Sequence, residues 1–138
     1  MVLRHTRAQI FEAFSRAFGA YPTLFQLPRQ LDDFHTAWLC YPITVREDAG
    51  FARADMQESL EAVGIDTRTV WSGNLTRHPM MRGVKYRMPA SGLPNADAVF
   101  ERGMSLGMSH GMSDEEIDHV VNSIHAFASR FAPAVLPA

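Results

Sequence analysis

Residues 103–113 read GMSLGMSHGMS, with Gly-Met-Ser repeated three times at four-residue intervals. This spacing suits both a helix and a strand, so the glycines decide between them. A helix through Gly103, Gly107 and Gly111 would cost about 1 kcal/mol for each glycine relative to alanine. Ser113 and Glu116 form the Ser-x-x-Glu pattern of a capping box, which marks the start of a helix. We therefore predict a strand as far as residue 110 and a helix over residues 114–128.

The same stretch has a second interpretation, a sulfur-rich site for a soft ion such as copper(I). Such a site would gather Met104, Met108, Met112 and His110. On a strand, however, Met104, Leu106, Met108 and His110 line one face, whereas Met112 lies in the turn beyond it. Methionine commonly fills irregular gaps in a core. We therefore predict core methionines and no metal site.

Two more strands are predicted upstream. An alternating pattern over residues 35–45 places on one face Ala37, Leu39, Tyr41, Ile43 and Val45. Pro42 lacks a backbone donor, which indicates an edge position or a bulge. The segment IDTRTVW, residues 65–71, is rich in β-branched residues and predicts the other strand.

Helical spacing of apolar residues predicts the remaining elements. The expected helices cover residues 3–18, a segment ending at Gly64, a short segment from the N-cap Asn95 to about Arg102, and residues 114–128. Their expected core-facing residues are Ile10, Phe11, Phe14, Ala17, Phe18, Met56, Leu60, Val63, Ile117, Val120, Val121, Ile124 and Phe127. The connector after Gly19 is expected to be irregular, and residues 72–93 are expected to form a long loop of the kind that often carries function.

These elements predict an α/β (α+β) fold with about three short antiparallel strands packed against helices. At 138 residues the chain is expected to be a single domain. The net charge of −2 does not indicate a protein that binds nucleic acid. We see no signal peptide and no run of about 20 apolar residues for a membrane span. The lone Cys40 fits a reducing compartment, so a cytoplasmic protein is expected.

The candidate binding residues lie in TRTVWSGNLTRHPMM, residues 67–81, where a strand enters the long loop. Asn74 offers both a donor and an acceptor, and Arg68 and Arg77 offer forks that suit carboxylate or phosphate. His78 can titrate near neutrality. This set suits an anionic, hydroxyl-rich ligand. The alternative is that Asn-Leu-Thr-Arg after a glycine is plain turn chemistry.

A family resemblance bears on this choice. The segment WLCYPITVREDAGFARADMQESLEAVGIDTRTVWSGNLTRHPMM (residues 38–81), followed by LPNADAVFERGMSLGMSHGMSDEEIDHVVNSI (residues 93–124), resembles the C-terminal part of the DegT/DnrJ/EryC1/StrS family. These are sugar aminotransferases that depend on pyridoxal phosphate (PLP), and the chain is most similar to the nucleotide-sugar (4-keto-6-deoxyhexose) 3-dehydratases. The resemblance implies the small C-terminal domain of an aspartate-aminotransferase-like enzyme.

The resemblance also divides the chain and suggests roles for residues. It implies a connecting helix over residues 1–19, a small-domain core over residues 35–128 and an irregular tail over residues 129–138. Asn74, Arg77 and His78 would border the substrate site, with Arg68 and Tyr86 supporting the loop. The family's large domain, which supplies the groups that hold PLP, is not in this sequence. Because the only lysine, Lys85, lies in a loop between Arg82 and Arg87, we expect no catalytic residue and no PLP bound to this chain alone.

Two functions of different classes follow. In the first, the chain is the small domain of a nucleotide-sugar aminotransferase or 3-dehydratase, inactive alone and completed by a large PLP-binding domain on another chain. The nucleotide sugar would bind only to the complete enzyme. In the second, the chain is a non-catalytic interaction module, or a truncated remnant, that self-associates as a homo-oligomer. The N-terminal helix, with Phe11, Phe14 and Phe18, is the element expected to be exposed in that case.

Overall fold

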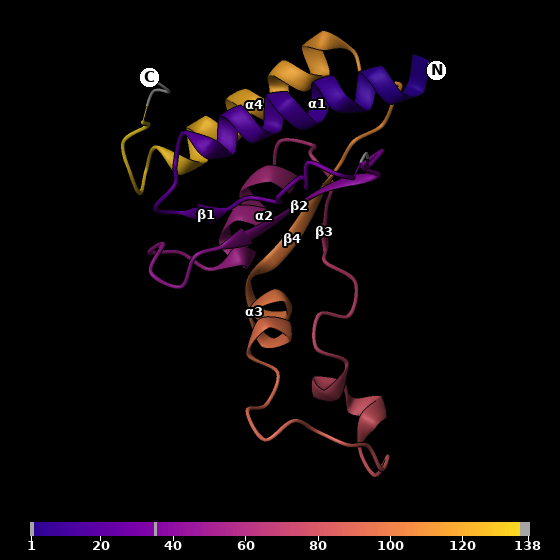
Figure 1. Ribbon diagram of the computed structural model, residues 1–138. Helices are drawn as coiled ribbons and strands as arrows, with labels where there is room; N and C mark the ends of the chain where they lie inside the picture. The colour runs from indigo at the N-terminus through magenta and orange to yellow at the C-terminus, as the bar shows by residue number, and fades with distance from the viewer. Residues whose placement is uncertain (1, 35, 136–138) are drawn as a thin grey trace.

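The computed structural model describes residues 2–34 and 36–135 (Figure 1). In chain order its elements are α1 (Val2–Gly19), β1 (Phe25–Gln26), β2 (Cys40–Val45), α2 (Arg53–Glu61), β3 (Thr67–Thr69), the 3-10 turns η1 (Leu75–Arg77) and η2 (Pro79–Met81), α3 (Pro94–Arg102), β4 (Gly103–Gly107) and α4 (Asp114–Ala128). The predicted mixed α/β fold is therefore confirmed. The expected positions of His35 and of residues 136–138 lie outside the described residues.

The four strands form one antiparallel sheet in the order β1-β2-β4-β3. The Gly-Met-Ser stretch supplies β4, which has a neighbour on each side. The fourth strand, β1, lies in the connector that was expected to be irregular, where Phe25 pairs with Val45 and Gln26 with Thr44. Because β1 reaches only these two residues of β2, Pro42 has a paired strand on one side only, as the missing donor predicted.

One face of the sheet meets α1 and α4, which run side by side over it (Figure 1). Tyr41, Ile43, Met104 and Leu106 point into this layer and are at most 1% exposed. The capping box is present: the Ser113 hydroxyl accepts from the Glu116 N–H, and the Glu116 carboxylate accepts from the Ser113 N–H. The last helix accordingly spans the predicted residues 114–128.

The prediction that α1 is the exposed element is wrong. Phe14 and Phe18 are fully buried, and their rings lie against that of Tyr41. Phe11 is partly buried and stacks on Trp38 with ring centroids 5.1 Å apart. The aromatic residues of α1 are covered by this chain's own sheet and connector, so over residues 6–19 the helix forms no unpartnered aromatic surface.

Several boundaries and orientations also differ from the prediction. The strand expected from residue 35 begins at Cys40, and Leu39 is 74% exposed. Val63 faces solvent because α2 has ended before it. Asn95 is not the N-cap of α3: Pro94 is the first helical residue, where its fixed φ suits the helix and its missing N–H is not needed.

The residues of the copper interpretation lie in different environments. Met104 and Met108 lie in the hydrophobic core, at 0% and 1% exposed. His110, expected on the same strand face, is exposed in the turn after β4. Among the described residues no three His, Cys, Asp or Glu side chains gather in a way that could hold a metal ion. In the same part of the chain no helix combines the length and apolar character needed to cross a membrane.

Residues 71–93, here called the arm, project from the body of the molecule (Figure 1). The arm runs outward from β3 through η1 and η2 and returns to α3, which leads back into β4. Asn74 is its one residue classed as buried. The arm therefore lies outside the hydrophobic core, and polar contacts to α3 hold its root.

Candidate functional site

The arm begins with a tight turn over residues 70–73, closed by a bond of 3.1 Å from the Gly73 N–H to the Val70 carbonyl. Trp71 has a φ of +43°, which is unusual for a bulky residue. Gly73 has a φ of +57°, and a Cβ there would lie 2.4 Å from the Cα of Phe100. Glycine is therefore required at position 73, and it lets the arm's root lie directly against α3.

Asn74 fixes the next turn from the inside. Its Oδ1 accepts from the backbone N–H of Thr76 at 3.0 Å and from the Thr76 hydroxyl at 2.7 Å, and its Nδ2 donates to Asp97 Oδ1 at 2.8 Å. The residue is 3% exposed. The side chain thus positions the residues that follow it. Its contact with a ligand stays a prediction.

Arg77 lies across the outer side of α3. Its Nη1 donates to Asp97 Oδ1 at 3.0 Å and to Glu101 Oε1 at 3.3 Å, and the guanidinium sits 5.3 Å from the centre of the Phe100 ring. The side chain is 48% exposed. Both of these hydrogen bonds use Nη1, so the other N–H groups of the guanidinium can donate to a ligand or to water.

His78 approaches Phe100 edge-to-face, with ring centroids 5.6 Å apart. Its Nε2 lies 2.8 Å from the carbonyl oxygen of Ser72. A carbonyl oxygen can only accept, so Nε2 carries the hydrogen, and Nδ1 of the neutral ring is left as an acceptor. The ring is therefore fixed in both orientation and tautomer by contacts within the chain.

A cleft of about 260 Å³ opens between this turn and α3, and it is lined in part by Arg53, Trp71, Ser72, His78, Phe100 and Glu101. Arg53 reaches it from α2, and its Nη1 donates to the Phe100 carbonyl at 2.9 Å and the Gly103 carbonyl at 3.1 Å. These bonds satisfy carbonyl groups at the end of α3. The cleft thus has an aromatic wall, a fixed imidazole and a carboxylate.

The structure brings Asn74, Arg77 and His78 together around α3, and it leaves the two other predicted residues apart. Arg68 lies on β3, 75% exposed, and pairs with Asp66 at 2.8 Å. Tyr86 lies farther out on the arm and is 49% exposed. Sequence reasoning missed Asp97 and Glu101, although their four-residue spacing places them on one face of a helix, where an arginine can bridge both.

The arrangement of sheet and helices matches part of the fold of solved sugar aminotransferases and dehydratases. E. coli GDP-4-keto-6-deoxy-D-mannose-3-dehydratase, solved with hydrated PLP, superposes with a TM-score of 0.76 at 20% identity, covering 89% of this chain and 31% of that one. A DegT/DnrJ/EryC1/StrS aminotransferase from Brucella abortus gives a TM-score of 0.74 at 21% identity, covering 91% of this chain and 31% of that one. At these identities the likeness concerns the fold.

The family follows from the sequence match. The chain belongs to the DegT/DnrJ/EryC1/StrS aminotransferase family, whose family model matches residues 2–125, and the expected resemblance is confirmed. A dTDP-4-dehydro-2,6-dideoxy-D-glucose 3-dehydratase from Saccharopolyspora spinosa is 42% identical over 94 residues, covering 68% of this chain and 20% of that protein. The lipopolysaccharide biosynthesis protein RfbH of Salmonella typhimurium is 31% identical over 117 residues, covering 85% and 26%. The chain therefore spans only a fifth to a quarter of these relatives.

The described residues of this chain do not supply the groups that PLP chemistry needs. An aminotransferase needs a buried amine for the imine with the cofactor, and Lys85 is exposed on the arm. The cleft beside α3 is smaller than the roughly 300–1,000 Å³ of most ligand pockets. Arg53, the only cation among its described lining residues, already uses its Nη1 on two carbonyl groups. No step of cofactor chemistry is assigned to these residues.

Proposed function

We propose that this chain is the C-terminal domain of a PLP-dependent nucleotide-sugar aminotransferase or 3-dehydratase of deoxysugar or lipopolysaccharide biosynthesis. It would act only together with a cofactor-binding part that lies outside these 138 residues. The names of the two relatives support the substrate class and the pathway type. The single free cysteine, Cys40, favours a reducing compartment, so the cytoplasm is the proposed location.

The observation that carries this proposal is the presentation of Arg77 and His78 on the same side of α3. Arg77 would bind an anionic group of the nucleotide sugar with the guanidinium N–H groups that Asp97 and Glu101 leave unused. The Nδ1 atom of His78 would accept a hydrogen bond from a sugar hydroxyl, because Nε2 already donates to the Ser72 carbonyl. Asn74 would position both residues, and Arg68 and Tyr86 would flank the site. None of these residues is proposed to be catalytic.

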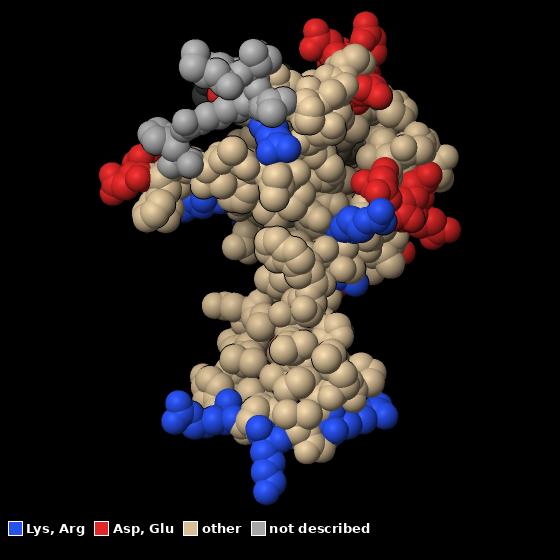
Figure 2. Space-filling view, turned by 90° about the vertical axis from the view of Figure 1, so that its right-hand side faces the viewer, with Lys and Arg blue, Asp and Glu red and all other residues tan. Residues whose placement is uncertain are grey.

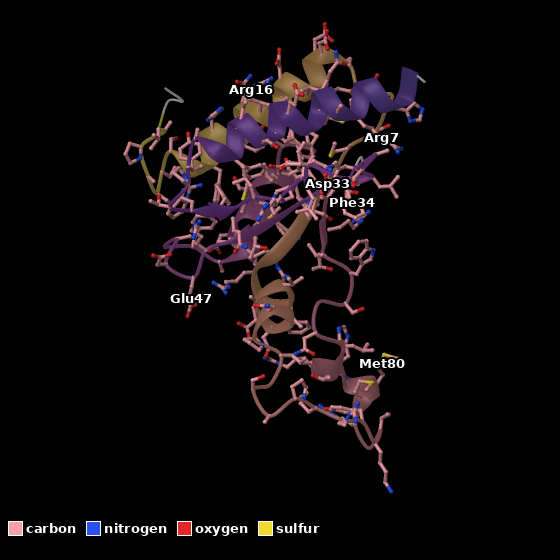
Figure 3. The ribbon with its side chains drawn as sticks, in the orientation of Figure 1. Arg7, Arg16, Asp33, Phe34, Glu47 and Met80 are labelled. Atoms are coloured by element: carbon pink, nitrogen blue, oxygen red, sulfur yellow. The ribbon has the colours of Figure 1, made fainter. Side chains whose placement is uncertain are left out.

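The role of Arg77 is tested in a chimera in which this chain replaces the matching segment of the Saccharopolyspora spinosa 3-dehydratase. We expect R77A to raise KM for the nucleotide sugar about tenfold or more with little change in kcat, since a hydrogen bond to a charged group contributes about 1.5–3 kcal/mol. R16A is the matched control, because Arg16 is an exposed arginine on α1, far from the cleft (Figure 3). Equal KM values for R77A and R16A would contradict the proposal.

The inactivity of the isolated chain is tested with PLP itself. Mixed with PLP and reduced with borohydride, the chain is expected to give no stoichiometric adduct by intact mass, and K85R is expected to behave like the unsubstituted chain. A one-to-one adduct that K85R abolishes would overturn this part of the proposal.

A non-catalytic interaction module is the second candidate. It is favoured by the exposure of apolar residues on the arm, among them Trp71 at 86% and Met80 at 72%. Light scattering during gel filtration is the direct test. A strict monomer at every concentration would rule out self-association, and the enzymatic proposal would be unaffected.

A further inference from the structure

Helix α3 carries Asp97, Phe100 and Glu101, which hold the root of the arm, but buried apolar packing does not fix α3 itself. None of its nine residues is buried. Figure 2 shows that the molecule narrows to a waist between the body and the arm, and α3 lies on the arm's side of this waist (Figure 1). Polar contacts that cross the waist therefore matter for the position of α3.

Arg53, the first residue of α2, makes such a contact from the body. Its Nη1 donates to the carbonyl oxygen of Phe100 at 2.9 Å and to that of Gly103 at 3.1 Å. These carbonyl groups lie where α3 ends, and the last carbonyl groups of a helix have no partner within it. Because the donor is charged, each bond is stronger than one between neutral groups. The Nε of Arg53 is buried and has no hydrogen-bond partner among the described residues, so the guanidinium is enclosed at this point.

A second side-chain contact between the body and α3 is weaker. Arg102 Nη1 lies 3.7 Å from a carboxylate oxygen of Glu47, whose side chain is 91% exposed. An ion pair that is so exposed contributes about 0–1 kcal/mol. Arg53 is partly buried, so water competes less for its two bonds. Of these two contacts, that of Arg53 is the stronger.

The residue whose carbonyl group Arg53 holds also shapes the candidate site. Phe100 lies so close to Gly73 that a Cβ at position 73 would be 2.4 Å from the Phe100 Cα. Its ring contacts His78 edge-to-face at 5.6 Å between centroids, and the Arg77 guanidinium lies 5.3 Å from its centre. A displacement of α3 would therefore move the surface against which Arg77 and His78 are placed.

We propose that Arg53 is a positioning residue of the candidate site. It fixes the end of α3 from α2, and α3 in turn sets where Arg77 and His78 are presented. Arg53 contacts no ligand in this role and acts through Phe100. The effect on substrate binding rests on the proposed function, whereas the coupling between α2 and the arm does not.

The test compares R53M and R53K in the chimera with the Saccharopolyspora spinosa 3-dehydratase. Methionine keeps an unbranched side chain but has no donor, and lysine keeps the charge and a donor. Q57M is the matched control, because Gln57 Nε2 donates to Thr67 Oγ1 at 3.0 Å and so joins α2 to β3, not to α3. R53M should raise KM for the nucleotide sugar about five- to tenfold with little change in kcat. R53K should raise it less than about threefold, and Q57M should leave it unchanged.

A double substitution separates positioning from a general loss of structure. If Arg53 acts through Arg77, adding R53M to R77A should change KM by less than about twofold, whereas independent effects would multiply. Effects that multiply, or equal KM values for R53M and Q57M, would overturn the proposal. A circular dichroism melt of each variant shows that it is folded.

Amide hydrogen exchange of this chain supplies a readout that does not need activity. R53M should speed exchange about tenfold in residues 76–78 and 98–102 and leave residues 41–45 of β2 unchanged, because the opening is local. If R77A alone leaves KM unchanged, the proposed role of the arm in substrate binding is wrong, and exchange alone then decides on Arg53. Exchange in residues 76–78 that R53M does not change would overturn the positioning role.

Discussion

The body and the arm of this protein are held in place by different forces. Every apolar residue of the described core lies at or before Ile65 or at or after Met104, so the arm and α3 contribute none. The arm's root is fixed instead by the buried Asn74 amide, by Arg77 on two carboxylates and by the close approach of Gly73 to Phe100. The hydrophobic core therefore stabilises the body without the arm, and side chains on the arm can be changed without opening that core.

The largest expected effect is a cavity in the body. Phe14 is fully buried against Tyr41, so F14A should lower the free energy of unfolding by about 3–5 kcal/mol. M80A on the arm removes a side chain that is 72% exposed and should change it by less than about 0.5 kcal/mol. Urea denaturation of both variants measures the contrast. A cost of several kcal/mol for M80A would show that the arm belongs to the same cooperative core.

The next effect concerns the root of the arm. N74A leaves Asp97 and the Thr76 N–H without their buried partner, which should cost about 1–3 kcal/mol. Because the bonds are local, the loss should appear mainly as faster proteolysis within residues 79–92. N95A, at an exposed asparagine one residue into α3, is the control and should be cleaved at the unsubstituted rate. Equal cleavage of N74A and N95A would mean that other contacts hold the arm.

The sequence predicted the elements well where the deciding interaction joins residues that are close together along the chain. The Ser113–Glu116 capping box fixed the start of α4, and the glycines of residues 103–113 excluded a helix there. The strand ends depended on distant partners instead. β2 begins at Cys40 because its partner strand β4 ends opposite it, at Gly107. The pattern within residues 35–45 carries no information on where β4 ends.

The candidate site likewise combines contacts that are local in sequence with contacts to distant residues. The nearness of Asn74, Arg77 and His78 follows from their places in one turn. Their contacts with Asp97, 23 and 20 residues away from Asn74 and Arg77, depend on how α3 returns along the arm. Arg68 was expected in the same group because it is near in sequence, but its place on β3 leaves it beside Asp66. Roles in substrate binding remain predictions for all five residues.

Alkaline pH should destabilise the body through its buried tyrosines. Burial raises the pKa of Tyr41 from 10.0 to about 12, and the hydrogen bond with Ser15 opposes this only in part. The neutral phenol is therefore favoured in the folded state. Its contribution is fully present below pH 10 and is lost as pH rises from 10 towards 12, because the unfolded chain ionises first.

Urea midpoints measured from pH 8 to pH 11.5 test this. The midpoint should fall above pH 10 more steeply for the unsubstituted chain than for Y41F. Burial also raises the pKa of Tyr21, so a smaller decline should persist in Y41F. Identical slopes for the two chains would show that Tyr41 ionises in the folded state as easily as in water.

The smallest expected change in the free energy of unfolding is a stabilisation, and it comes from a substitution on the arm. Trp71 has φ +43° and is 86% exposed, so its indole gains little burial to offset a left-handed backbone. That conformation costs a non-glycine residue about 1–2 kcal/mol, and the added freedom of glycine in the unfolded chain costs about 0.5–1 kcal/mol. W71G should therefore stabilise the monomer by up to about 1 kcal/mol. S72G, at a neighbour without positive φ, should instead destabilise it by about 0.5–1 kcal/mol. If the urea midpoints of both variants fall together, packing of the indole outweighs the backbone strain. Side-chain contacts of the arm would then contribute to the stability of the chain.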